Sequence, residues 1–294
     1  MWNKLLSDIT NGDRKSLARC ISLVENEYNG YQQLLMSLNP QNTKVIGITG
    51  PPGAGKSTLT DALIEQIIQQ GKKVGVLCVD PSSPFNLGAL LGDRIRMSRW
   101  YNHPDVFIRS LASRGSLGGL HPKILEIIHV MQCTNFDYII VETVGVGQSE
   151  VEIAGLADIT MVVLVPEAGD EIQTMKAGLM EVADIFVVNK ADRPDADLFV
   201  KNLRLMVGDN HQTDTIPVVK TVASKQEGLD LLYKHIEEKS IHHQNNERKY
   251  MLMTEKAFQL IQQHRMKDIN KQLLLQQIKE QNTNNVYQFI QTFI

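Results

Sequence analysis

The residues most suited to chemistry lie between positions 47 and 59, GITGPPGAGKSTL, where glycine, proline, lysine and a Ser-Thr pair replace core-forming side chains. Positions 50–57 fit the phosphate-binding pattern G-x-x-x-x-G-K-[ST]. Glycines let successive backbone N–H groups point at phosphate oxygens, and the following helix N-terminus adds partial positive charge. We expect Lys56 to reach the β- and γ-phosphates and Ser57 to place its hydroxyl on Mg²⁺. The nucleotide-binding residues expected here are Gly50, Pro52, Gly53, Ala54, Gly55, Lys56, Ser57 and Thr58.

The segment FVVNKAD indicates which base is bound, because Asn189, Lys190 and Asp192 form N-K-x-D at the end of an apolar run. An aspartate there can accept hydrogen bonds from N1–H and the 2-amino group of guanine, whereas adenine offers no such pair of donors. The stem of Lys190 can lie over the base. Many GTPases carry an S-A-x loop behind the base, but here Val222 occupies the usual serine position, so we expect only a backbone contact near Ala223. The chain therefore predicts GTP or GDP as its nucleotide.

Three carboxylates follow the phosphate-binding segment and are candidates for the magnesium side of the site. Glu142 ends an apolar run and opens E-x-x-G, in which Gly145 can offer its N–H to the γ-phosphate. Asp80 ends another apolar run, and Asp93 lies in the segment after it. Carboxylate oxygens suit Mg²⁺. Either Asp80 or Asp93 could be only a turn former or a helix cap, and Asp80, next to Pro81, is a natural turn on its own.

Hydrolysis also needs a group that orients water. Ras-like enzymes place a glutamine directly after the switch glycine, but this chain has Val146 there, and Gln148 is the nearest glutamine. We expect slow intrinsic hydrolysis, with Lys56 and Gln148 as catalytic candidates and a missing part completed by a partner or a second switch. A non-hydrolysing scaffold is the alternative that Val146 leaves open. The assisting arginine, if one is used, stays open among Arg94, Arg96, Arg114 and a partner's residue.

The elements that must position these residues alternate along the chain. Apolar, β-branched runs predict strands within residues 44–49, 72–80, 106–111, 136–145, 158–166, 183–190 and 215–224. Helical spacing separates several of them, as in residues 56–71 and 228–239. This alternation predicts an α/β fold: a doubly wound, mostly parallel sheet of the P-loop NTPase type, with ligands at the carboxyl ends of the strands.

Helical extensions are expected on both sides of that sheet. Residues 1–40 show an apolar helical stripe and form the expected N-terminal extension, and residues 41–240 form the P-loop GTPase domain. Residues 241–294 are glutamine-rich, without strand signals, and predict two or three amphipathic helices. They could pack on the parent domain or form a dimerisation arm, and we favour the arm. The apolar positions of the N-terminal stripe are Leu5, Ile9, Leu17, Cys20, Ile21 and Val24.

Composition excludes several function classes. The 294 residues carry a net charge of −3, which gives no indication of a nucleic-acid partner. The three cysteines are scattered, which argues against a disulfide framework and fits a reducing cytosol. No signal-peptide pattern or bilayer-length apolar run is visible, so we expect a cytoplasmic protein without a membrane partner.

Several longer strings of the sequence are specific enough to indicate one protein family. They are ETVGVGQSE, DPSSPFNLGALLGDRIRM, SRGSLGGL and NKAD, preceded by NGDRKSLARCISLVE. From about residue 8 to about residue 235, the sequence resembles the MeaB/ArgK/MMAA family of P-loop GTPases. The resemblance implies a chaperone that gates cofactor loading and protects a cobalamin-dependent acyl-CoA mutase, typically methylmalonyl-CoA mutase. It also implies a homodimer formed through C-terminal helices. Compared with the family pattern, the C-terminal tail of this chain is short and rich in glutamine.

The resemblance further assigns site residues. It implies that Mg²⁺ is surrounded by Ser57, Asp80, Asp93 and Glu142. Residues 166–176 resemble a third switch that communicates with the mutase, in which Asp170 and Lys176 match functional positions. Wider relatives act as metallochaperones, which remains the alternative function. The chain's one adjacent histidine pair, at positions 242 and 243, has no cysteine near it, and a surface linker is favoured there.

Overall fold

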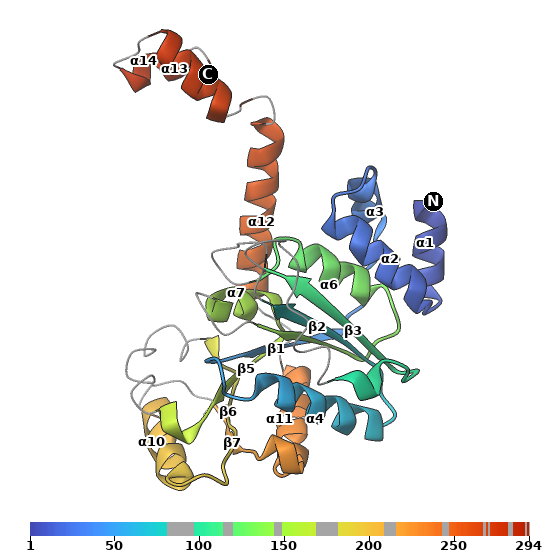
Figure 1. Cartoon of the computed structure of the whole chain (residues 1–294), viewed down its shortest axis with the longest axis vertical. Coiled ribbons are helices and arrows are strands. Elements are labelled where there is room, and N and C mark those ends of the chain that lie inside the picture. The colour runs from blue at the N-terminus through green and yellow to red at the C-terminus, as the bar shows by residue number, and fades with distance from the viewer. Residues whose placement is uncertain are drawn as a thin grey trace. The chain divides into compact units, whose positions relative to one another are not determined.

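The computed structural model describes residues 1–80, 97–113, 120–143, 149–168, 182–208, 216–242, 247–266, 269, 271–281, 285–291 and 293. Within them, seven strands form one sheet in the order β3-β2-β4-β1-β5-β6-β7 (Figure 1). Each neighbouring pair is parallel, which confirms the predicted fold class. The strands are β1 (Lys44–Thr49), β2 (Val74–Asp80), β3 (Val106–Ala112), β4 (Tyr138–Glu142), β5 (Ile159–Leu164), β6 (Ile185–Val188) and β7 (Val218–Lys220).

Helices cover both faces of the sheet, which is why its strands are apolar on both sides. On one face, α4 (Lys56–Gln69) and α11 (Leu229–His242) lie side by side, as Figure 1 shows, and enclose a core with β-branched residues of the central strands. The other face carries α6 (Ile124–Gln132), α7 (Ser149–Leu156) and α10 (Ala196–Gly208). Gly47 of β1 faces α7 so closely that an added Cβ would lie 2.6 Å from Ile153.

The N-terminal forty residues are divided into three helices: α1 (Trp2–Thr10), α2 (Arg14–Glu25) and α3 (Tyr31–Ser37). The six residues of the predicted apolar stripe are all buried, as expected. α2 begins at a cap in which the Asp13 carboxylate accepts a 2.6 Å hydrogen bond from Ser16 N–H. It packs against α6, and its Glu25 binds Arg109 of β3 at 2.9 Å. The N-terminal helices are thereby attached to the sheet.

Aspartates fix the amino ends of several strands. Asp158 accepts a 2.8 Å hydrogen bond from Val45 N–H at the start of β1. Asp137 does the same for Lys73 N–H at 2.7 Å, just before β2, and a third such contact joins Asp184 to Thr160 N–H at 2.7 Å in β5. Each carboxylate gives an acceptor to a backbone donor at the first residues of a neighbouring strand. The register of these parallel strands is therefore anchored at their amino ends.

Residues Tyr250–Ile294 form a separate compact unit, apart from Met1–Lys249. The C-terminal helices are α12 (Glu247–Arg265), α13 (Lys271–Glu280) and α14 (Val286–Ile290). They expose large apolar side chains, among them Phe258 and Ile261 of α12. Three short 3₁₀ turns complete the elements used below: η1 (Ser98–Trp100), η2 (Pro166–Ala168) and η3 (Ala223–Lys225). None of the helices in the described ranges is both long and apolar enough to cross a membrane.

Candidate nucleotide-binding site

The phosphate-binding segment connects the carboxyl end of β1 to the first residue of α4. Two of its glycines are required by geometry. Gly50 has φ +136°, and an added Cβ would lie 2.1 Å from the carbonyl oxygen of Val163. Gly55 has φ +90°, and an added Cβ would lie 2.5 Å from Nδ2 of Asn189. A side chain at either position would strain the backbone and push the loop away from the sheet or from the N-K-x-D segment.

Lys56 opens α4 and is buried inside the loop that precedes it. Its ammonium donates to the carbonyl oxygens of Gly50 at 2.9 Å and Pro51 at 3.1 Å. A buried ammonium held against two neutral carbonyls is well placed to exchange them for charged phosphate oxygens, which form stronger hydrogen bonds. Of the other predicted loop residues, Ala54 is buried, Thr58 is half-buried, and Pro52 and Gly53 are exposed.

The magnesium side joins α4 to the carboxyl end of β4. The Ser57 hydroxyl lies 2.6 Å from Oε1 of Glu142, and the Thr60 hydroxyl lies 2.8 Å from Oε2 of the same carboxylate. Asp80 ends the neighbouring strand β2 and is buried. A serine hydroxyl and two buried carboxylates form a set of hard oxygen donors, which fits Mg²⁺. Asp93, the fourth expected ligand, lies outside the described residues.

The described ranges contain no group of three or more His, Cys, Asp or Glu side chains that could hold a metal ion by themselves. A magnesium ion at this edge of the sheet would therefore share its coordination between two described carboxylates, the Ser57 hydroxyl and the phosphates of the nucleotide, the usual arrangement for Mg²⁺. Sequence reasoning did not find Thr60, because its contact with Glu142 spans 82 residues.

The N-K-x-D segment lies against the phosphate-binding loop. Asn189 donates a 2.9 Å hydrogen bond to the carbonyl oxygen of Ala54. Its Oδ1 accepts from the Thr221 hydroxyl and from Ala223 N–H, each at 3.2 Å. Lys190, in a left-handed conformation with φ 56°, donates from Nζ to the Gly53 carbonyl at 2.7 Å. One asparagine thus connects the three loops that would surround the nucleotide's base and phosphates.

Asp192, the residue expected to bind guanine, is exposed, and its Oδ2 accepts a 3.0 Å hydrogen bond from the Lys225 ammonium. This charged hydrogen bond is the main reason why the pKa of Asp192 lies below its usual value. The carboxylate is therefore ionised at neutral pH, as an acceptor for two guanine donors must be. Lys225 was not singled out from the sequence, where it lies 33 residues from Asp192.

The remaining candidates fall outside the described residues, and the structure gives no account of them. They are Asp93, Gly145, Gln148, Asp170 and Lys176, together with Val146 and the three arginines considered for hydrolysis. Only the first residues of the third-switch segment are described, and they form η2. There, Glu167 accepts a hydrogen bond from Arg193, the residue after Asp192.

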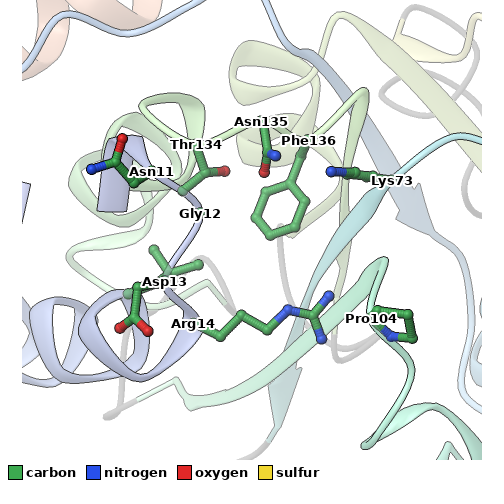
Figure 2. A pocket seen from close by; sticks show the side chains of 10 residues that line it. Asn11, Gly12, Asp13, Arg14, Lys73, Pro104, Thr134, Asn135 and Phe136 are labelled. Carbon is green, nitrogen blue, oxygen red and sulfur yellow. The ribbon is translucent and has the colours of Figure 1, made fainter. Parts of the chain in front are cut away.

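A separate cavity of about 200 Å³ lies at the amino ends of the strands, whereas the nucleotide site lies at their carboxyl ends. It is formed where the α1–α2 turn meets the residues that precede β2, β3 and β4. Figure 2 shows Arg14 extending toward Pro104, with Phe136 and Lys73 on the facing side. Arg14 donates to the His103 carbonyl at 2.6 Å. Among the described residues, no predicted site residue lines this cavity, which separates it from the described part of the nucleotide site.

Comparison with known proteins supports the assignment of the chain to a family of GTPases. The family described as "Methylmalonyl Co-A mutase-associated GTPase MeaB" matches residues 17–282. A Pyrococcus abyssi protein named as a GTPase is 49% identical over 245 residues, which are 81% of this chain and 76% of that protein.

Two further relatives extend the comparison. The Escherichia coli protein named GTPase ArgK is 43% identical over 190 residues, which are 63% of this chain and 57% of ArgK. Among solved structures, that of LAO/AO transport system kinase superposes with a TM-score of 0.72 and 25% identity. The match covers 99% of this chain and 95% of that one.

Proposed function

This chain belongs to the MeaB family of P-loop GTPases, and from that premise we propose that it is a GTP-driven chaperone of a cobalamin-dependent acyl-CoA mutase. The expected client is methylmalonyl-CoA mutase, the enzyme that the family description names. In this proposal, GTP binding and hydrolysis gate the loading of the mutase with its cofactor and protect the loaded enzyme. The family match carries the choice of client, and the convergence of the phosphate loop and the N-K-x-D segment through Asn189 supports the guanine-nucleotide site.

The residues of the chain divide the work on the nucleotide. The Gly50 to Gly55 backbone and the Lys56 ammonium bind phosphate oxygens, and Asp192 accepts the two guanine donors. Ser57, Asp80 and Glu142, with Asp93, would hold Mg²⁺, which neutralises charge on the phosphates when bound. Gly145 would contact the γ-phosphate, Gln148 would orient water, and we expect the intrinsic rate to be slow.

A signal to the mutase needs a path from the nucleotide to the surface that contacts it. We propose the third-switch segment for this role, with Asp170 and Lys176 as its functional residues. The ion pair between Arg193 and Glu167 supports this, because it joins the loop after β6, which carries Asp192, to the first residues of that segment. A change at the nucleotide can therefore be transmitted through a directly bonded pair of side chains.

We also propose that the chain is a cytoplasmic homodimer. The exposed apolar residues of α12, Phe258 and Ile261 among them, are typical of a helix that buries one face against a partner. Replacing both with glutamate should convert the dimer to a monomer in light scattering, whereas glutamate at Lys256, on the same helix, should not. A dimer that persists in the double variant would contradict an interface on this face.

GTP hydrolysis by the purified chain, with and without the mutase of the same host, tests the chaperone proposal. We expect slow turnover alone, a higher rate with the mutase, and none in Lys56→Ala. Nucleotide-dependent association should appear in a pull-down with the same two proteins. An unchanged rate and no association would contradict the mutase as client. Stoichiometric nickel, cobalt or zinc binding outside the Mg²⁺ site would then favour the metallochaperone.

A further inference from the structure

We propose that Lys225 is a specificity-determining residue of the guanine site: its ammonium orients the Asp192 carboxylate toward the base. The inference rests on the proposed guanine site and goes beyond it, because it assigns a role to a residue outside the N-K-x-D motif. The observation is the 3.0 Å contact between Lys225 Nζ and Asp192 Oδ2.

The need for such a residue follows from Val222. Many GTPases have a serine at this position, whose hydroxyl can support the base-binding carboxylate, but an isopropyl group has no proton to donate. Val222 is instead buried under the loop, and its carbonyl accepts the N–H of Lys225 at 2.8 Å. This contact closes η3 and places Lys225 one turn further along the chain. A charged donor thus replaces the missing hydroxyl from a neighbouring position.

The two loops that carry the pair are held together by their backbones. Ala191 N–H donates to the Thr221 carbonyl at 3.0 Å, and β6 and β7 are hydrogen-bonded neighbours in the sheet. On the far side of η3, Gln226 has φ 61° and bonds Glu65 of α4 at 3.1 Å. Lys225 therefore projects from a turn fixed at both ends, and its reach to Asp192 does not depend on a freely moving loop.

The hydrogen-bonding capacity of Asp192 is compatible with both partners. Recognition of guanine uses one oxygen for N1–H and the other for the 2-amino group. Each carboxylate oxygen has two acceptor positions, so Oδ2 can keep the Lys225 contact while it accepts from the base. The ammonium also holds the carboxylate in one rotamer before the nucleotide arrives, which lowers the entropy lost on binding.

A purely structural role for the pair is the competing explanation, and exposure argues against it. The side chains of Asp192 and Lys225 are 42% and 55% exposed. Ion pairs exposed to this degree contribute little to fold stability. The same protein offers a matched pair away from the base, Lys220 with Asp197, at 2.7 Å and also exposed. If the Lys225–Asp192 pair contributed only to fold stability, breaking either pair would have the same effect on nucleotide affinity.

Inosine triphosphate separates the two explanations, because it keeps N1–H but lacks the 2-amino group of guanine. We would measure the affinities of GTP, ITP and ATP for the wild-type chain and for Lys225→Gln, Lys225→Arg and Lys220→Gln. In Lys225→Gln we expect GTP affinity to fall about threefold and ITP affinity to fall less, so that the GTP-to-ITP preference shrinks. Lys225→Arg should retain the preference, and Lys220→Gln should match the wild type.

The outcomes are distinguishable. Equal losses of GTP and ITP affinity in Lys225→Gln, or no loss, would overturn the assignment while leaving the guanine site in place. A wild-type chain that bound GTP and ATP equally would overturn the guanine site itself. The mutase is absent from these measurements, so a failure of the chaperone proposal would not affect them.

Discussion

The Ser57 hydroxyl lies 2.6 Å from Oε1 of Glu142, and this contact joins the first turn of α4 to the last residue of β4. A hydroxyl can donate its proton to a carboxylate while its lone pairs coordinate a cation. The same carboxylate is fixed at its second oxygen by Thr60. Glu142 is therefore oriented by the protein itself, and its contact with Ser57 places a hydroxyl oxygen and a carboxylate side by side, as a shared magnesium ion would require.

Glu142→Gln tests this arrangement. An amide can still accept one of the two hydroxyl contacts, but it removes the charge that balances Mg²⁺. We expect at least a tenfold lower GTP hydrolysis rate and a higher magnesium requirement, since charge-assisted contacts are about twice as strong as neutral ones. Magnesium titrations of GTP turnover measure both. Glu126→Gln, at a buried glutamate of α6, is the control, and an equal loss there would contradict the assignment.

Gly55→Ala should separate the phosphate loop from the base-binding loop. The new methyl group would lie 2.5 Å from Asn189 Nδ2, at a backbone φ of +90°. Both the strain and the lost Asn189 contact disfavour binding, and we expect GTP affinity to fall by about 100-fold, or about 3 kcal/mol. Fluorescent GTP titration measures it. Gly53→Ala meets open space at φ +79°, so its loss should be smaller; equal losses would argue against the Asn189 contact.

The strands and the phosphate-binding loop were predictable because they depend on local patterns. Runs such as VGVLCV are apolar and β-branched enough to require burial on both faces, and residues 50–57 carry their own geometric requirement in their glycines. The helical character of the first forty residues also follows from spacing. Its division at Gly12 and Gly30 follows from left-handed φ angles of 84° and 89°, which the apolar stripe does not encode.

The contacts that complete the site were not predictable, because they join residues far apart in the chain. Lys225 reaches Asp192 only because β6 and β7 are neighbours in the sheet. Asp158 anchors Val45 across 113 residues. Their residue types carry no local signature, because a lysine or an aspartate in a sequence is ordinarily taken to be a solvent-exposed side chain. Strand order decides which of them meet, and strand order is a property of the whole fold.

The aspartates at the amino ends of the strands should stabilise the fold in proportion to their burial. Asp158→Ala removes the acceptor of Val45 N–H in a buried position, and we expect the free energy of unfolding to fall by about 1–3 kcal/mol. Asp137→Ala removes the corresponding contact to Lys73 where water can replace it, and should cost less. Urea unfolding of both variants measures the difference. A larger loss in Asp137→Ala would contradict this explanation.

Alkaline pH should weaken the packing of α2 on the domain through Cys20. This thiol is fully buried, and burial, reinforced by the nearby Cys133, raises its pKa from 9.0 to about 12. Below pH 9 the thiol is neutral in the folded and unfolded chains alike. Between pH 9 and pH 12 only the unfolded chain loses the proton, so stability falls as pH rises, by about 1.4 kcal/mol per unit.

Urea unfolding at about pH 8 and about pH 10.5, under reducing conditions, measures this slope, and we expect a loss of about 2 kcal/mol from Cys20 over that interval. Cys20→Ala lowers the stability at both pH values, because it leaves a small cavity, but it removes the ionisable group. The variant should therefore lose less stability on the alkaline side than the wild type does. The pKa of Cys133 is also raised by burial, so some slope should remain in the variant. If the free energy of unfolding fell equally with pH in the two proteins, ionisation of the Cys20 thiol would not be the cause of the alkaline destabilisation.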